Sequence, residues 1–108
     1  MNTKVYLVYG DFEADCCGDI FDYHHEFMDK VCLSKESARK AIEDIVLQAY
    51  YEACDSADYD IMREEQLGAY YDRYDYLQFD VTEDLGDKIT YEDRKGIHDV
   101  YYEEYDAN

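Results

Sequence analysis

Five potential metal ligands lie close together in the first third of the chain. They fall between residues 16 and 32 and are Cys16, Cys17, His24, His25 and Cys32. Structural zinc sites are built from such thiolate and imidazole groups, usually spaced as C-x2–4-C and H-x3–5-H. Neither spacing occurs here, because two of the cysteines and both histidines are directly adjacent. We therefore expect no metal and no other cofactor, and we interpret these residues as small buried thiols and two exposed imidazoles.

The same side chains could in principle supply a nucleophile and its base. Such a pair would join an adjacent cysteine to one of the histidines, His98 included, but no catalytic signature surrounds these residues. The chain also lacks a G-x-S-x-G, Walker or G-x-G-x-x-G motif. A catalytic carboxylate pair needs two acids with separated pKa values, and the sequence singles out no such pair. We expect that the protein is not an enzyme.

Carboxylates are by far the most numerous charged groups. The 108 residues include 28 Asp and Glu against 10 Lys and Arg, which leaves a formal net charge of −18 at pH 7. The acids are spread along the chain, so self-repulsion weakens the compact state and opposes contact with nucleic acid or an anionic membrane. We therefore expect a strongly basic, nucleic-acid-binding protein as the partner, with no direct binding to nucleic acid or membrane.

The charges also form a pattern along the chain. Residues 10–29 contain no Lys or Arg, and acid-rich segments extend from residue 41 onward. Between them lies a basic island: Lys30, Lys35, Arg39 and Lys40. Acids two residues apart on a strand are separated by about 6.6 Å, and acids four apart on a helix by about 6 Å. Both separations are near the phosphate-to-phosphate step of a nucleic-acid strand, so strands and helices could display negative charge at phosphate-like intervals. The basic island departs from such an all-acidic display, and we expect it on a non-binding face or in self-association.

Tyrosine is the second unusual component, with 14 Tyr and no Trp. Tyrosines occur as tandem pairs at Tyr50–Tyr51, Tyr70–Tyr71 and Tyr101–Tyr102. A ring can fill the core, or it can stay at the surface beside an acid, where it suits Arg by stacking and charge pairing. Both roles stay open for each ring. We predict a partner-binding surface that draws on Asp11, Glu13, Asp15, Asp19, Asp22, Asp55, Asp58, Asp60, Glu64, Glu65, Tyr70, Tyr71, Asp72 and Asp75.

A single α+β domain over residues 1–108 is expected to position these groups, because the chain has no proline, repeat or linker. β-Branched and aromatic residues predict a small antiparallel sheet of three to four strands. The candidate segments are 4–9, 24–33, 74–82, 97–105 and a short stretch at 88–92. The first of these is apolar on both faces, which predicts an interior strand. Residues 10–22 and the remainder of 83–96 are expected as loops.

One helix is strongly indicated. Ser34 offers a capping side chain and Glu36 places a carboxylate in the first turn. Apolar residues then recur at helical spacing from Ala38 to Ala53, which predicts a main helix over about 35–54. Residues 55–60 are expected as a turn, followed by a shorter second helix over about 60–72.

In size, charge and abundance of Tyr, Asp and Glu, the whole chain resembles phage-encoded acidic inhibitors, namely anti-restriction DNA mimics and acidic anti-CRISPR proteins. Three segments are also similar to small phage proteins of unknown function: Lys4–Tyr9, Val31-Cys-Leu-Ser-Lys-Glu-Ser-Ala38 and the closing Tyr-Tyr-Glu-Glu-Tyr-Asp. The resemblance implies an inhibitor that occupies the DNA- or PAM-binding groove of a host-defence nuclease, with a CRISPR effector favoured over a restriction enzyme. The alternative is a small phage or bacterial α+β adaptor that binds a basic protein without DNA mimicry.

The sequence also carries expectations about location. It has no apolar run of about 18 residues, and its N-terminus lacks the apolar core of a signal peptide. The four cysteines therefore indicate reduced thiols, and we expect a cytoplasmic protein, in the host bacterium if the gene is a phage gene. The sequence leaves the oligomeric state open.

Overall fold

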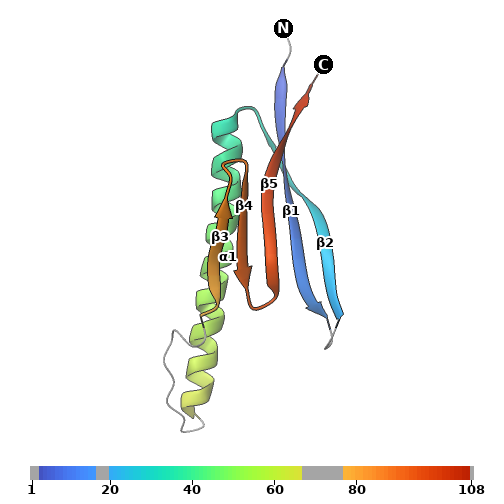
Figure 1. Ribbon diagram of the computed structural model, residues 1–108. Helices are drawn as coiled ribbons and strands as arrows, with labels where there is room; N and C mark the ends of the chain where they lie inside the picture. The colour runs from blue at the N-terminus through green and yellow to red at the C-terminus, as the bar shows by residue number, and fades with distance from the viewer. Residues whose placement is uncertain (1–2, 17–19, 67–76, 108) are drawn as a thin grey trace.

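The computed structural model describes the backbone of residues 3–16, 20–66 and 77–107, and most of the side chains within these ranges. The side chains of residues 14–16, 20–24, 60–61 and 63–66 are outside the description. The elements in chain order are β1 (Lys4–Cys16), β2 (Ile20–Cys32), α1 (Lys35–Gln66), β3 (Phe79–Asp84), β4 (Lys88–Asp93) and β5 (Gly96–Asp106) (Figure 1).

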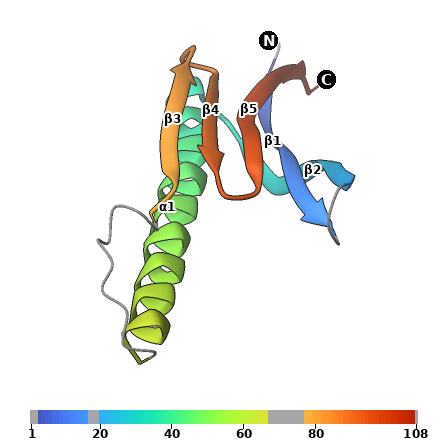
Figure 2. The ribbon, with the colours of Figure 1, turned by 60° about the horizontal axis from the view of Figure 1, so that its bottom comes forward.

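The chain forms an α+β fold with a five-stranded antiparallel sheet in the order β2-β1-β5-β4-β3. The helix α1 packs against one face of this sheet (Figures 1 and 2). Strand residues alternate between the two faces, so apolar side chains on one face meet the helix. The resulting core consists of Val8, Ala41, Ile42, Val46, Ile89, Tyr91 and Val100.

The first strand is longer than the sequence predicted. The expected loop over residues 10–22 is wrong for its described part, because β1 continues to Cys16 and β2 begins at Ile20. Gly10 does not end the strand. A Cβ atom there would lie 2.2 Å from Cε2 of Phe12, so the glycine makes room for a ring that packs over the backbone. The following acids alternate with apolar residues and belong to a strand with one polar face.

The helix is also longer than predicted. The expected turn over 55–60 is wrong, and residues 60–66 belong to the same helix rather than to a second one, while 67–72 lie outside the described residues. Asp and Ser lower helix propensity by less than about 0.7 kcal/mol each, and the stretch has no Gly or Pro. Ala53 and Ala57 extend the apolar stripe, and Ala57 is fully buried.

The start of α1 confirms the predicted cap. The Ser34 hydroxyl accepts a hydrogen bond from the Ser37 amide at 3.1 Å, and the Ser34 carbonyl accepts one from the Ala38 amide at 3.0 Å. From this cap the 32-residue helix runs along the sheet, and its C-terminal part projects beyond the strands at the end opposite the chain termini (Figures 1 and 2).

The C-terminal strands confirm most of the expected pattern. The short strand at 88–92 and the final strand at 97–105 appear as β4 and β5. The strand expected at 74–82 is shifted, because β3 spans 79–84 and residues 74–76 lie outside the description. The sheet has five strands instead of the predicted three to four, and two tight turns join β3 to β4 and β4 to β5. Gly86 and Gly96, with φ of 90° and 134°, allow these turns.

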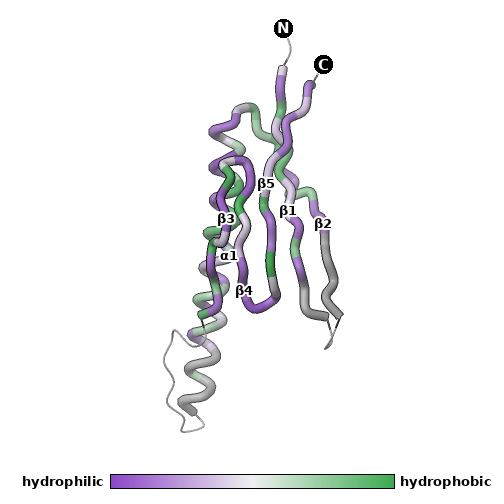
Figure 3. Tube along the Cα trace, in the orientation of Figure 1, coloured by the Kyte–Doolittle hydropathy of each residue, from purple (hydrophilic) through white to green (hydrophobic). Residues whose placement is uncertain are grey.

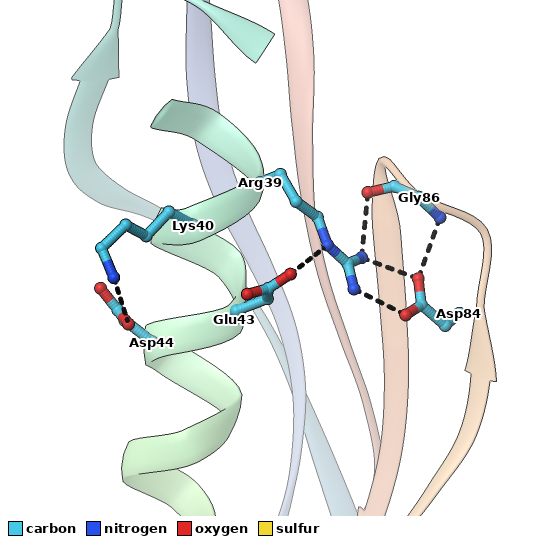
Figure 4. A network of polar contacts seen from close by, with 6 residues as sticks. All are labelled: Arg39, Lys40, Glu43, Asp44, Asp84 and Gly86. Carbon is cyan, nitrogen blue, oxygen red and sulfur yellow. Dashed lines mark hydrogen bonds and ion pairs between the residues drawn. The ribbon is translucent and has the colours of Figure 1, made fainter. Parts of the chain in front are cut away.

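An arginine from the basic island ties α1 to the β3–β4 turn (Figure 4). The Arg39 guanidinium donates to both Asp84 carboxylate oxygens at 2.7 and 2.6 Å, to the Gly86 carbonyl at 3.0 Å and to Glu43 at 2.7 Å. Asp84 also accepts the Gly86 amide at 2.9 Å. A two-pronged bond of this kind fixes both position and orientation. We call these four residues the Arg39 clamp.

Two of the four members of the basic island, Arg39 and Lys40, are paired with acids of α1. Lys40 lies 3.8 Å from Asp44, one turn further along α1, in the same i,i+4 arrangement as Arg39 and Glu43. Such pairs contribute a few tenths of a kcal/mol, about 0.2–0.5 each. Arg39 and Lys40 therefore face acids of their own helix and of β3, whereas Lys30 and Lys35 are exposed without an ion pair among the described residues.

The Arg39 clamp predicts a pH-dependent stability. The hydrogen bonds from Arg39, and then that from the Gly86 amide, hold the pKa of the Asp84 carboxyl below its usual value. Because the pKa of Asp84 is lowered in the folded protein, its stabilisation is complete above the pKa that Asp84 has in the unfolded chain. This stabilisation is lost as the pH falls through the pKa that Asp84 has in the folded protein. We expect Asp84→Asn to lower the urea midpoint at neutral pH, with the difference from the parent shrinking toward pH of about 2.5.

The exposed pair of Lys40 and Asp44 provides the control for this experiment. Asp44→Asn removes an exposed carboxylate of α1 that makes no two-pronged bond, so its urea midpoint should differ little from that of the parent at either pH. An equal loss for both variants would show that general charge, rather than the clamp, sets the effect.

Candidate functional site

The face of the sheet that α1 leaves uncovered, here called the open face, collects acids from several strands. Directly paired residues of neighbouring strands point to the same side. One such row crosses all five strands through Glu83, Thr90, Asp99, Asp11 and His25. The next row contains Asp80, Glu92 and Ile97, and the Ile97 amide donates to the Glu13 carboxylate at 3.0 Å. The open-face acids are Asp11, Glu13, Asp80, Glu83, Glu92 and Asp99.

Like charges lie directly opposite one another in these rows. Asp80 faces Glu92 across β3 and β4, and both residues are exposed. Asp11 faces Asp99 across β1 and β5. Neighbouring strands are about 4.8 Å apart, and like charges opposite each other destabilise a sheet. The open face thus carries a concentration of negative charge that an approaching cation would relieve.

Two of the open-face acids, Asp99 and Asp11, interact with neighbouring side chains. The Thr90 hydroxyl donates to Asp99 at 2.6 Å, and the Lys88 ammonium group lies 3.8 Å from the same carboxylate. Asp11 forms a close hydrogen-bonded pair with the His25 ring. Among the described side chains, Asp80, Glu83 and Glu92 have no hydrogen-bond or ion-pair partner, and all three are exposed. The most accessible charge therefore lies toward β3 and β4.

Aromatic rings occupy the open face beside the acids. This aromatic cluster consists of Tyr9, His25, Phe27 and Tyr101, contributed by β1, β2 and β5. Tyr9 stacks on His25 with ring centroids 5.3 Å apart and planes inclined by 12°, and on Tyr101 at 5.8 Å and 26°. His25 and Tyr101 are themselves stacked at 6.3 Å and 28°. The three rings form a nearly parallel set, with Phe27 tilted against Tyr9.

A carboxylate borders these rings. The Tyr101 hydroxyl lies 3.5 Å from the Asp11 carboxylate and 3.3 Å from Nδ1 of His25. A flat π surface with a carboxylate at its edge suits a guanidinium group, which stacks on rings and pairs with carboxylates at the same time. The arrangement is therefore chemically suited to a guanidinium group.

Tyr105 and Glu103 extend the open face toward the C-terminus of β5. The Tyr105 hydroxyl donates to Glu103 at 2.5 Å. This hydrogen bond, together with one to Tyr9, raises the pKa of Tyr105 above its usual value. The single hydroxyl hydrogen of Tyr105 is thus engaged with Glu103 at the rim of the face.

The structure separates the residues that the sequence had grouped as partner-binding. Asp11 and Glu13 lie on the open face. Asp55 and Asp58 are exposed on the C-terminal half of α1. For the others the backbone alone is described, or nothing. Asp15 and Asp22 belong to β1 and β2, Asp60, Glu64 and Glu65 belong to α1, and Asp19, Tyr70, Tyr71, Asp72 and Asp75 lie outside the described residues.

Sequence reasoning missed several members of the open face. Asp80, Glu92 and Asp99 were not selected, nor were Tyr9, Phe27 and Tyr101. Period-2 alternation is the signal that could have found them, since each acid stands between two residues that face the helix. Alternation shows which residues of one strand share a face. It does not show which residues of neighbouring strands lie side by side, because that depends on the order in which the strands pair.

Glu13 joins the open face to a buried histidine. Its backbone amide donates to Nδ1 of His98 at 3.0 Å, and Nε2 of His98 lies 2.7 Å from the Asp93 carboxylate. Because Nδ1 accepts, Nε2 must carry the hydrogen and donate to Asp93. His98 is only 3% exposed, and both of its nitrogens are engaged. His98 therefore connects β1 and β4 to β5 through side-chain hydrogen bonds. Because both nitrogens are engaged, neither is available as a base.

The two hydrogen bonds of His98 lead to a prediction about stability. His98→Phe retains the ring volume but leaves the Glu13 amide and the Asp93 carboxylate without their partner. We expect a loss of about 1–3 kcal/mol in the free energy of unfolding, measured by urea denaturation. His25→Phe, at an exposed histidine of the open face, should change it by about 0.5 kcal/mol or less. Equal losses in the two variants would contradict the role of the buried hydrogen bonds.

The potential zinc ligands are only partly visible. His25 is engaged with Asp11, and Cys32 is a partly buried free thiol. The side chains of Cys16, Cys17 and His24 lie outside the described residues. Among the side chains that the structure describes, no three His, Cys, Asp or Glu groups lie close enough to hold a metal ion.

Comparison of the chain with protein-family models, curated proteins and solved structures finds no match. In the described part of the chain, no helix combines the length and the apolar character that crossing a membrane requires. Hydrophilic residues recur along both the helix and the strands (Figure 3).

Proposed function

We propose that the protein inhibits a basic, nucleic-acid-binding protein by presenting its open face in place of nucleic acid. The target that fits best is a host-defence nuclease, and a CRISPR effector is favoured over a restriction enzyme. On this proposal the protein acts in the bacterial cytoplasm without a cofactor and without catalysis.

The observation that carries the proposal is the opposition of like charges on an uncovered sheet face. Asp80 and Glu92 lie directly opposite each other and are exposed, an arrangement that costs stability in the isolated protein. A cationic groove that normally holds phosphates would neutralise such a surface. The adjacent aromatic cluster supplies stacking surfaces, as bases do in nucleic acid, for Arg side chains of the target.

The aromatic cluster also supports the second candidate function. Aromatic side chains are enriched at the energetic centres of ordinary protein interfaces. An adaptor that binds a basic partner through these rings would need no mimicry of phosphate spacing. The two functions differ in where the partner is bound, because a mimic competes with nucleic acid and an adaptor does not.

A competition experiment tests the proposal. A pull-down from bacterial lysate recovers the partner, and a gel-shift assay then measures whether the protein displaces DNA from it. We expect displacement that weakens steeply as salt rises from about 0.05 to 0.5 M, because contacts between exposed charges are screened.

The outcome separates the two functions. A ternary complex of DNA, partner and this protein would support the adaptor and overturn mimicry. Displacement that persists unchanged at high salt would also count against a mechanism based on the open-face acids.

A further inference from the structure

A second exposed apolar surface lies on the helix side of the sheet, between α1 and the edge strand β3. This α1–β3 groove has a volume of about 480 Å³ and is lined by Val46, Leu47, Tyr50, Phe79, Val81 and Ile89, with Glu43 and Asp84 also at its border. Leu47, Tyr50 and Val81 are 47%, 38% and 47% exposed. Large apolar side chains grouped in this way commonly mark a binding surface.

The groove runs beside a free sheet edge. β3 is the last strand in the sheet order, and among the described strands it pairs only with β4. Its residues 79–81 keep a regular register with β4, before an irregularity that follows Val81. The opposite edge, β2, is distorted by Asp29, whose φ is 54°. The backbone of β3 is thus a template for one more strand.

We propose that the groove binds an extended segment of a partner protein, which pairs with β3 as a sixth strand and alternates apolar with basic residues. Alternate side chains of an added strand point to opposite faces. Those on the helix side would meet Leu47, Tyr50 and Val81. Those on the other side would extend the rows of the open face beside Asp80 and Glu83, where Lys or Arg provides complementary charge.

A second copy of the chain is a poorer occupant. β3 has the sequence Phe-Asp-Val-Thr-Glu-Asp and contains no Lys or Arg. Pairing two copies through this strand would place carboxylates of one copy close to those of the other, which destabilises the pairing. Each copy also carries a formal net charge of −18, so the molecules repel each other at longer range.

A synthetic peptide tests this inference without any nuclease, so its failure is distinguishable from failure of the proposed function. The probe is a fluorescently labelled peptide of about eight residues, in which Leu and Lys alternate. Comparison peptides have the same composition with Leu and Lys in separate blocks, or the same alternation with every internal backbone amide methylated, so that neither edge of the peptide can donate to β3. We expect the alternating peptide to bind at least about tenfold more tightly than either, measured by fluorescence anisotropy.

Variants of the groove locate the binding. Leu47→Asp and Val81→Asp should each weaken binding of the alternating peptide about tenfold, whereas Leu33→Asp, at a leucine that is 76% exposed and does not line the groove, should not. Hydrogen exchange should show slower exchange of β3 amides in the complex. Circular dichroism checks that each variant is folded, and Leu47 on the helix surface provides a second variant if Val81→Asp unfolds.

Three results would overturn the inference. Equal binding of the methylated peptide would rule out strand addition, since it keeps the same side chains and charge. Equal binding to the parent and to both groove variants would place the peptide elsewhere on this acidic protein. Concentration-dependent dimerisation that Val81→Asp abolishes would identify a second copy as the occupant.

Discussion

Reversing Asp80 and Glu92 to Lys should slow association with a basic partner about tenfold or more while leaving the fold intact. Both side chains are exposed and lie opposite each other, so the double variant removes the most accessible charge of the open face. The repulsion between the two carboxylates is replaced by a similar repulsion between the two lysines, so the free energy of unfolding should change little. Stopped-flow binding to an oligoarginine peptide, and then to the partner recovered from lysate, measures the rate.

The matched control reverses two carboxylates elsewhere. Asp55→Lys with Asp87→Lys changes the net charge by the same amount, at an exposed helix position and in the β3–β4 turn. If the open face is the binding surface, this variant should associate much faster than the Asp80 and Glu92 variant, although both have the same net charge. A larger loss of association rate for this control than for the Asp80 and Glu92 variant would place the binding surface near α1 and the β3–β4 turn.

Ile42→Ala should lower the free energy of unfolding by about 2–5 kcal/mol, the largest stability effect we expect for a single conservative change. Ile42 is fully buried and packs in the centre of a core with few members. Domains of this size are stable by only about 5–15 kcal/mol, and self-repulsion of the acids reduces that margin. Urea denaturation followed by circular dichroism measures the loss.

Leu47→Ala provides the comparison for this prediction. Leu47 belongs to the same helix and loses a similar volume on truncation, but it is 47% exposed. Its loss should stay below about 1 kcal/mol. Similar losses at both positions would mean that α1 is not packed on the sheet as described.

Much of the fold could be predicted from local patterns. The Ser34 cap and the apolar stripe of α1 are encoded within a few residues, and both were confirmed. The β4 and β5 segments were also recognisable from their composition. The predictions failed where composition was weighed above periodicity, as in the acidic stretch after Gly10 and the Asp-rich stretch at 55–60, both of which continue a regular element.

The candidate site depended on tertiary structure to a much greater degree. The sequence selected Asp11 and Glu13, but it placed them in a loop and could not connect them to Asp99 or to Glu92. Those pairings join residues far apart in the chain, and they follow from the strand order β2-β1-β5-β4-β3. This order depends on the long-range pairing of β1 with β5, which no local sequence pattern specifies.

By itself the sequence determined the amount of negative charge, the capped helix and the alternation that gives each strand one polar face. These are properties of composition and of short-range geometry. The tertiary structure decided which polar faces adjoin, that Arg39 is used in a clamp to Asp84, and that one face of the sheet stays uncovered. The physical reason is that a single helix can bury only one side of a five-stranded sheet, so acids scattered along the chain come together on the other.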